Sequence, residues 1–520
     1  MTDSPYRATK LVTQAKLFTI AKTLGAAVAL GYQFLLVRHL SVPDYVSFTI
    51  LTAVNAILAF CTMFGMDRLT YRYMPPMREA GRWREMLLFM GGLLLLRQVT
   101  MLVIWFIIGW LCVGMLPKQI GSEILRLPWH YVGFAVAVAF TDSISTFCNS
   151  LGLQGRQAML MLAMTLLRFA LSAVLIYGFG GLDAVQISTI LVGTEFLLAA
   201  GLTLSLAMEL APLARVRPVP PIHFGIAWRS VAVESLSTQL AYMLTLPFRG
   251  GLMKVFVGAV ASPVVTASFG FFQTIADRVY QLLPVFMMKG FVEPALANDY
   301  AKRQDMGRVQ LTVSLLLRLN FVILMLALAI LLGCGEPLIN LVTRDRYGSQ
   351  VLVAGLLLLQ MAGMTIGEAL WMAVNPVGRI LYHNRVWVWV SVLCYGVMAL
   401  AAAAHSPELL IIVSALPYGL VYAWLRWGSH EPVMQQGLGF GWFWQLAIPV
   451  VLAAAAARLV LWGFGNSPVV VVAAAVAAVA CFILVLRRLT LVSAADSADL
   501  TSMSPRLVRM LRLFTTVGKH

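Results

Sequence analysis

Charged side chains are scarce in this sequence. Asp, Glu, Lys and Arg make up 12% of its 520 residues, whereas about 25% is usual in soluble proteins. Hydrophobic residues make up 60%, against about 45–50% in soluble proteins. A chain with so few polar side chains cannot cover its surface with groups that water solvates. The composition therefore excludes a soluble multidomain protein and predicts an all-α polytopic membrane protein.

The sequence also lacks the residue patterns of enzymes and metal sites. Its six cysteines lie in or beside apolar runs without CxxC or metal-ligand spacing, so they predict small core residues rather than disulfides. It has no DxD sugar-nucleotide motif and no phosphate-binding loop with Lys-Ser/Thr, and its seven histidines are scattered. These absences argue against an enzyme, and they predict no catalytic residues, no metal and no cofactor.

Positive charge is in excess, with 38 Lys and Arg against 22 Asp and Glu. In membrane proteins basic residues collect in cytoplasmic loops, so the excess predicts topology rather than nucleic-acid binding. The most basic segments are 67–86, 209–229 and the tail after 487. All three follow even-numbered predicted spans, which places both termini in the cytoplasm.

Apolar runs near the ~20 residues that cross a bilayer as a helix occur fourteen times. They lie at 17–37, 46–66, 87–116, 129–151, 158–178, 185–208, 229–248, 263–289, 310–334, 350–374, 386–404, 408–427, 441–463 and 468–486. A basic, proline-rich break after the sixth run indicates two six-helix lobes in a pseudo-twofold arrangement plus two C-terminal helices. The predicted segments are the N-terminal lobe 1–208, a cytoplasmic linker 209–228, the C-terminal lobe 229–428, spans thirteen and fourteen in 429–486, and a basic tail 487–520. From Ser504 onward the tail fits either an amphipathic helix on the membrane surface or a frayed end.

Ionisable residues inside predicted spans are costly and are candidate functional residues. The cations are Lys22, Arg97, Arg168, Arg278 and Arg318. The anions are Asp142, Glu195, Glu234, Asp277 and Glu368. In a functional interpretation the cations line a cavity open to the cytoplasm and bind a pyrophosphate or sugar, because Arg forms bidentate bonds to phosphate.

A structural interpretation of the same residues stays open beside the functional one. In it, Arg168 pairs with Glu195 or Asp142 inside one lobe, and Lys22 extends its ammonium to the lipid headgroups. The carboxylates are then ion-pair partners, although one of them is a candidate to carry a coupling proton.

Four short motifs resemble those of a known family. Residues 36–45 (LVRHLSVPDY) resemble the R-x-L-G-x-x-x-Y/F-G turn after helix one of polysaccharide-transport flippases, in the multidrug/oligosaccharidyl-lipid/polysaccharide (MOP) superfamily. Residues 64–69 (FGMDRL) resemble that family's G-h-D/E-x-x-h end of helix two. Residues 152–157 (GLQGRQ) resemble its loop after helix four, and residues 291–294 (FVEP) its helix-eight end. The sequence departs from the pattern at Ser41, where the family usually has Gly, and at Val46-Ser47.

With fourteen spans, the resemblance covers nearly the whole chain and implies a Wzx-type flippase. Such a protein moves a polyprenyl-pyrophosphate-linked oligosaccharide from the cytoplasmic to the periplasmic leaflet of the bacterial inner membrane by alternating access. The product feeds exopolysaccharide, capsule or O-antigen synthesis. Among the family's basic cavity residues, Lys22 and Arg278 correspond by helix rather than by motif.

The expected partners are this lipid-linked glycan, the bilayer, and a polysaccharide polymerase with its assembly machinery, around a monomeric transporter. The alternative is a MATE-like drug/cation antiporter of the same superfamily. Coupling to an H⁺ or Na⁺ gradient stays open in both cases.

Overall fold

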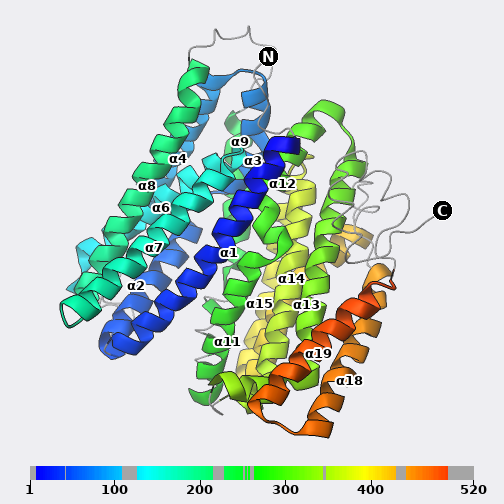
Figure 1. Cartoon of the computed structure of the whole chain (residues 1–520). Coiled ribbons are helices and arrows are strands. Elements are labelled where there is room, and N and C mark those ends of the chain that lie inside the picture. Colours follow the sequence, from blue (N-terminus) through cyan, green and yellow to red (C-terminus); the bar gives the residue numbers. More distant parts are fainter. Residues whose placement is uncertain are drawn as a thin grey trace. The chain divides into compact units, whose positions relative to one another are not determined.

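A computed structural model describes residues 8–40, 42–107, 126–214, 228–249, 252–253, 256–257, 263–343, 347–428 and 441–489. Within these ranges the regular elements are helices, and none is a strand. The α-helices, shown in Figure 1, are α1 (Ala8–His39), α2 (Val42–Cys61), α3 (Met66–Glu79), α4 (Trp83–Phe106), α6 (Pro128–Ser150), α7 (Gln154–Gly178), α8 (Ala184–Ala214), α9 (Trp228–Thr245), α11 (Pro263–Leu282), α12 (Pro284–Arg303), α13 (Met306–Thr343), α14 (Val351–Val374), α15 (Ile380–Ala403), α16 (Pro407–Ala423), α18 (Ala447–Phe464) and α19 (Pro468–Leu486).

The predicted all-α membrane fold is confirmed. Each of the fourteen apolar runs overlaps at least one helix of the described residues, and ten helices of this part are long and apolar enough to cross a membrane. The run at 263–289 is divided, because Pro284 begins a new helix directly after α11. Proline lacks the N–H that would continue the hydrogen-bond ladder. The predicted tail helix after Ser504 and most of the predicted linker lie outside the described residues.

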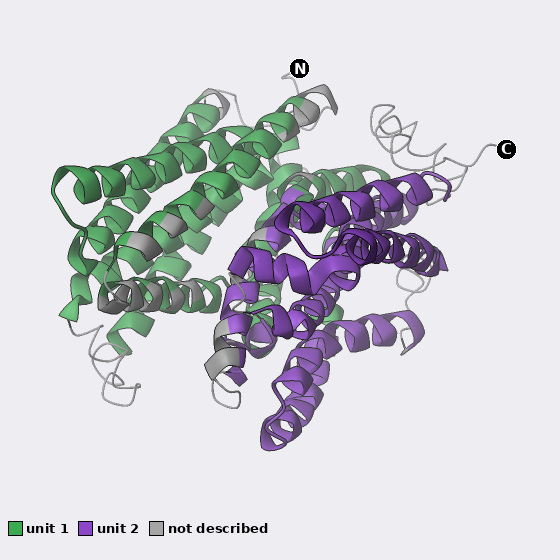
Figure 2. Ribbon diagram, turned by 60° about the horizontal axis from the view of Figure 1, so that its bottom comes forward, with its two compact units in different colours: residues 1–244, 288–304, 375–385 green, residues 245–287, 305–374, 386–520 purple. Residues whose placement is uncertain are grey.

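The chain divides into two compact units (Figure 2). Unit 1 comprises residues 1–244, 288–304 and 375–385, and unit 2 comprises residues 245–287, 305–374 and 386–520. Unit 1 therefore holds α9, most of α12 and the turn after α14 together with the N-terminal helices. The lobe boundaries expected from the sequence stay a prediction.

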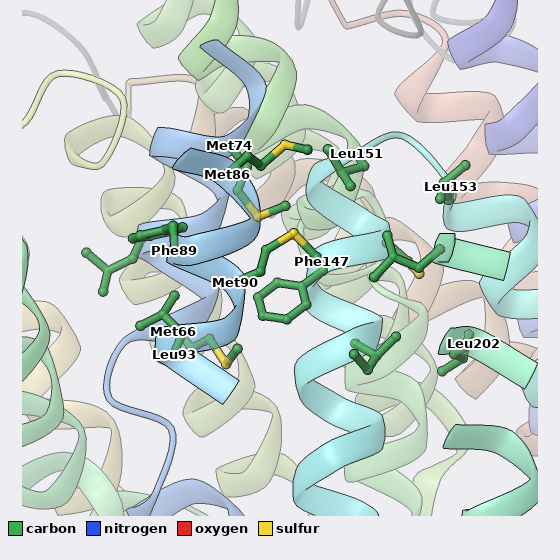
Figure 3. Close-up of a cluster of buried hydrophobic side chains, with 14 of the residues drawn as sticks. Met66, Met74, Met86, Phe89, Met90, Leu93, Phe147, Leu151, Leu153 and Leu202 are labelled. Carbon is green, nitrogen blue, oxygen red and sulfur yellow. The ribbon is translucent and has the colours of Figure 1, made fainter. Parts of the chain in front are cut away.

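Unit 1 has a core rich in methionine where α3 packs on α4, α6 and α8. Figure 3 shows Met66 and Met74 of α3 near Met86 and Met90 of α4, with Phe147 of α6 beside them. Methionine is flexible and fills irregular gaps between helices well. This core holds one face of α3, and α3 residues outside the core contact α9 and α12, as described below.

Unit 2 is organised around α13, which is kinked at Cys334. Helices α18 and α19 pack against each other and against α13. The contact with α18 is close at Gly333, where an added Cβ would lie 2.7 Å from Ala457 Cβ. Small residues let membrane helices approach in this way. The two C-terminal helices are therefore an integral part of this unit.

Candidate functional site

The turn before α3 requires glycine for two reasons. Gly65 has φ 61°, in the left-handed region that other residues rarely adopt. An added Cβ would also lie 2.6 Å from Thr238 Cγ2 on α9. The backbone N–H of Phe64 donates to Gln239 Oε1 at 2.7 Å, which ties the turn to the same helix. The first turn of α3 therefore packs directly on α9.

Two consecutive charged residues of α3 are buried there. Asp67 is 4% exposed and Arg68 is 1% exposed. Lys289 Nζ on α12 lies 2.8 Å from Asp67 Oδ2. Arg68 Nη1 donates to both carboxylate oxygens of Glu293, at 3.2 Å and 2.9 Å. Lys289 and Glu293 are four residues apart, so they share one face of α12.

Two neutral side chains complete this arrangement. The hydroxyl of Tyr242 on α9 donates to Asp67 Oδ1 at 2.9 Å and accepts from Arg68 Nε at 3.3 Å. Asn375 Nδ2 donates to Glu293 Oε1 at 2.6 Å and to the backbone O of Arg68 at 3.0 Å. These six residues are named the α3 charge cluster: Asp67, Arg68, Tyr242, Lys289, Glu293 and Asn375. Its four charges cancel, and hydrogen bonds offset the cost of burying them.

The electrostatics of the cluster keep Asp67 ionised. Burial raises the pKa of a carboxyl group, because it removes water from the charged form. At Asp67 the Lys289 ammonium and the Arg68 guanidinium outweigh burial and hold the pKa below its usual value. The Asp67 carboxylate is therefore a fixed charge at neutral pH and not a group that exchanges protons.

A second ion pair lies one turn further along α3. Arg72 Nη1 lies 2.9 Å from Glu234 Oε1 on α9, and the Tyr73 hydroxyl donates to Glu234 Oε2 at 3.2 Å. Burial raises the pKa of Tyr73 to about 12, so its hydroxyl keeps its proton at neutral pH. Gly378 has φ 79°, and a Cβ there would lie 2.5 Å from Arg72 Nη2. The turn after α14 thus packs against the same guanidinium.

Among the residues predicted from the sequence, two pairs form inside unit 1. Arg97, 2% exposed, bonds to Asp142 Oδ2 at 3.2 Å and to Ser143 Oγ at 3.2 Å. Arg168 bonds to Glu195 Oε1 at 2.5 Å. The sequence predicted Glu195 or Asp142 as the partner of Arg168, and in the structure Arg168 pairs with Glu195. Each guanidinium bridges neighbouring helices, α4 to α6 and α7 to α8.

The other predicted residues are dispersed. Lys22 Nζ lies 5.2 Å from the centroid of the Phe18 ring on α1. Arg318 on α13 and Glu368 on α14 are partly exposed, and exposed Asp277 accepts from Gln273 Nε2 at 2.8 Å. The side chain of Arg278 lies outside the described part. A shared substrate cavity for the five cations stays a prediction.

The candidate charged residues predicted inside spans do not include those of the α3 charge cluster, but the motifs carry a signal for it. Asp67 and Arg68 belong to the 64–69 motif, and Glu293 belongs to the 291–294 motif. A third motif joins them, because Gln154 Nε2 donates to the backbone O of Gly290 at 2.6 Å. Three motifs far apart in the sequence therefore meet at one place.

Comparisons with solved structures reveal the fold. No family model and no curated protein sequence matches the chain. The structure of a mutant of the Vibrio cholerae MATE transporter VcmN matches with a TM-score of 0.59 at 15% identity. The match covers 82% of this chain and 99% of that chain. The chain has the MATE transporter fold.

Other members of the MOP superfamily match to a similar degree. An outward-facing MATE transporter matches with a TM-score of 0.61 at 10% identity, over 81% of this chain and 95% of its own. A MOP superfamily transporter from Pyrococcus furiosus, described as having a binding pocket of reverse polarity, matches with a TM-score of 0.61 at 10% identity. That match covers 79% of this chain and 94% of the other. The shared fold is that of a multi-pass membrane transporter.

Proposed function

We propose that the chain is a secondary transporter that works by alternating access, with the α3 charge cluster as the lock of one closed state. One observation carries this proposal. Two ion pairs of the cluster, Asp67 with Lys289 and Arg68 with Glu293, join α3 to α12, whereas Asp67 and Arg68 also pair with each other within α3. Tyr242 and Asn375 add hydrogen bonds from α9 and from the turn after α14. Separation of α3 from these three segments breaks all of the contacts between the segments together.

Buried ion pairs suit a contact that must open and close. An intact buried pair adds little net stability, because the loss of hydration offsets the attraction, whereas removal of one partner costs about 3–5 kcal/mol. When α3 separates from α12 and water enters, both partners regain hydration. The closed and open states then stay close in free energy, so a bound cargo can shift the balance between them.

The charges of the sequence support a cytoplasmic position for the lock. The cluster begins the predicted cytoplasmic segment 67–86, and α12 ends in Lys302 and Arg303. Basic residues favour the cytoplasmic side of a membrane. With the lock closed, the transport path is sealed from the cytoplasm, and both termini lie on that side of a bacterial inner membrane.

For the cargo, the comparisons favour an ion-coupled exchange carrier of the MATE type over a lipid-linked glycan flippase, because the matching structures are described as MATE transporters. Such a carrier needs a carboxylate that the protein does not fully enclose. The Asp142 side chain is 46% exposed, whereas the paired side chains of Glu195 and Glu234 are 12% and 5% exposed. Of the three predicted carboxylates for which an arginine partner is described, Asp142 is the most exposed, and Asp142, held by Arg97, is the proposed coupling residue for H⁺ or Na⁺.

A flippase for a polyprenyl-pyrophosphate-linked oligosaccharide is the second candidate, and one observation favours it. The matched transporters are covered over 94–99% of their length, but only 79–82% of this chain is covered. The chain also has a pair of apolar helices at its C-terminal end, α18 and α19, of which α18 bears exposed Val451, Leu459 and Trp462. Such helices offer additional surface to a polyprenyl chain in the bilayer.

Two measurements separate these cargoes. In liposomes with an imposed H⁺ or Na⁺ gradient, the exchange carrier moves a cationic dye such as ethidium, and Asp142→Asn abolishes this flux. Asp183→Asn, a matched change at an exposed aspartate, leaves it unchanged. For a flippase, depletion in the native host leads to complete lipid-linked repeat units that a periplasmic glycosidase cannot reach. If neither flux nor accumulation is observed, the transporter proposal is wrong.

A further inference from the structure

A cavity of about 480 Å³ lies within unit 1, beside the Arg72–Glu234 pair. Its polar wall comprises Arg72, Arg82, Ser230 and Gln304, and Met77 and Ala297 belong to its apolar wall. These residues come from α3 and the turn after it, from the start of α9, and from the end of α12. Pro376 and Val377 of the turn after α14 also line the cavity.

The lining of this cavity is cationic. Arg72 and Arg82 are its charged residues, and no Asp or Glu of the described chain lines it. The carboxylates that bond these arginines, Glu234 and Glu85, stand outside the lining. Each guanidinium has five N–H donors in a planar fork, so it can bond its carboxylate and an additional anion together. A phosphate group fits this arrangement.

We propose that this cavity binds a small amphiphile with one phosphate group and that the bound ligand keeps the α3 charge cluster closed. The phosphate bonds to Arg72 and Arg82, and the apolar body packs on Met77 and Ala297. The second half of the proposal rests on the proposed lock. The cavity exists only while α3, α9, α12 and the turn after α14 are together, so a ligand that fills it stabilises the closed state.

Binding of 1-naphthyl phosphate to the purified full chain, measured by titration calorimetry in phosphatidylcholine nanodiscs, tests the site. Arg82→Gln is expected to weaken binding at least tenfold. The matched control is Arg84→Gln, which removes the same charge two residues away, where Arg84 lies over the Trp83 ring and outside the lining. The control changes the affinity less than twofold. Equal effects of the two variants, or equally tight binding of neutral 1-naphthol, would overturn the site.

The phosphate has two sources, which native mass spectrometry distinguishes. A phospholipid adduct that is retained by the wild type and lost in Arg82→Gln identifies a lipid headgroup. Naphthyl phosphate binding without such an adduct identifies a soluble phosphate ester. Absence of both contradicts the proposal.

A separate variant tests the link between ligand and lock. Asp67→Asn weakens the α3 charge cluster without touching the cavity lining, and it is expected to lower the affinity for naphthyl phosphate at least threefold, by lowering the closed population. An unchanged affinity overturns the link to the lock, while the comparison of Arg82→Gln with Arg84→Gln still decides the site. None of these binding measurements depends on transport. A failure of the transporter proposal would appear in the flux and accumulation assays instead.

Discussion

Lys289 Nζ lies 2.8 Å from Asp67 Oδ2. This ion pair is one of two between α3 and α12, and the charges follow one another in opposite order on the two helices. On α3 a negative residue precedes a positive one, Asp67 and then Arg68. On α12 the order is reversed, with Lys289 one turn before Glu293. A shift of either helix by one turn would place like charges together, so the cluster specifies one register as well as one closed state.

Reversal of one ion pair tests this complementarity. Arg68→Glu places two buried carboxylates together and is expected to destabilise the protein by about 3–5 kcal/mol. Glu293→Arg alone has a similar cost, and the double variant recovers at least half of the summed loss. Thermal unfolding of the four proteins gives the coupling energy. Additive losses in the double variant would show that the two side chains do not act as a pair.

A comparison of alanine substitutions at Gly65 and Gly180 separates the cost of backbone strain from the cost of close packing. Gly65→Ala and Gly180→Ala both force alanine into a left-handed conformation, with φ 61° and 79°, at a cost of roughly 1–2 kcal/mol each. An added Cβ at Gly180 meets no atom within 4 Å, whereas at Gly65 it meets Thr238. Gly65→Ala is therefore expected to lower the unfolding midpoint clearly more. Equal midpoints would contradict the close packing of this turn on α9.

The stability of the cluster depends on pH in one direction. The folded pKa of Asp67 lies below its usual value, so its contribution is fully present above the unfolded pKa of about 3.9. It is lost as the pH falls through the folded value. The stability difference between the wild type and Asp67→Asn is expected to be constant from pH 7 to 5 and to shrink toward pH 3. Asp183→Asn is the exposed control, and a difference that grows on acidification would contradict the assignment.

The fold could be predicted from the sequence because membrane helices leave a local signal. A span needs a long apolar run, and each such run overlaps a helix in the described part of the chain. The break at Pro284 has an equally local cause, because proline carries no N–H to continue the run as one helix.

The site could not be located by the same reasoning, because its partners are far apart in the sequence. Arg68 and Glu293 are separated by 225 positions, and nothing in the pattern of either segment specifies the other. The basic residues of segment 67–86 predicted a cytoplasmic loop, whereas residues 66–79 form the helix α3. Lys289 is the last residue of the run at 263–289, and it is not among the five cations predicted inside spans. The motif resemblance alone linked the segments that meet.

A disulfide between α6 and α12 is expected to stop transport. An added Cβ at Gly290 on α12 would lie 3.4 Å from Asn149 Cβ on α6, close to the Cβ separation of about 3.5–4.5 Å in disulfides. The double variant Asn149→Cys with Gly290→Cys, in a background without native cysteines, should be inactive when oxidised and recover on reduction. The single-cysteine variants control for the oxidant. Full activity of the oxidised double variant would show that α12 need not leave α6.

The distance between spin labels at Glu79 and Lys302 tests the lock most directly. This pair lies at the ends of α3 and α12, with 3.2 Å between Lys302 Nζ and Glu79 Oε2, and the loss of such an exposed pair costs at most about 1 kcal/mol. Pulsed electron paramagnetic resonance on the full chain in nanodiscs should give a short and a long distance. Asp67→Asn with Glu293→Gln should shift the population to the long one. A single short distance that these substitutions leave unchanged would contradict the proposal that the α3 charge cluster opens.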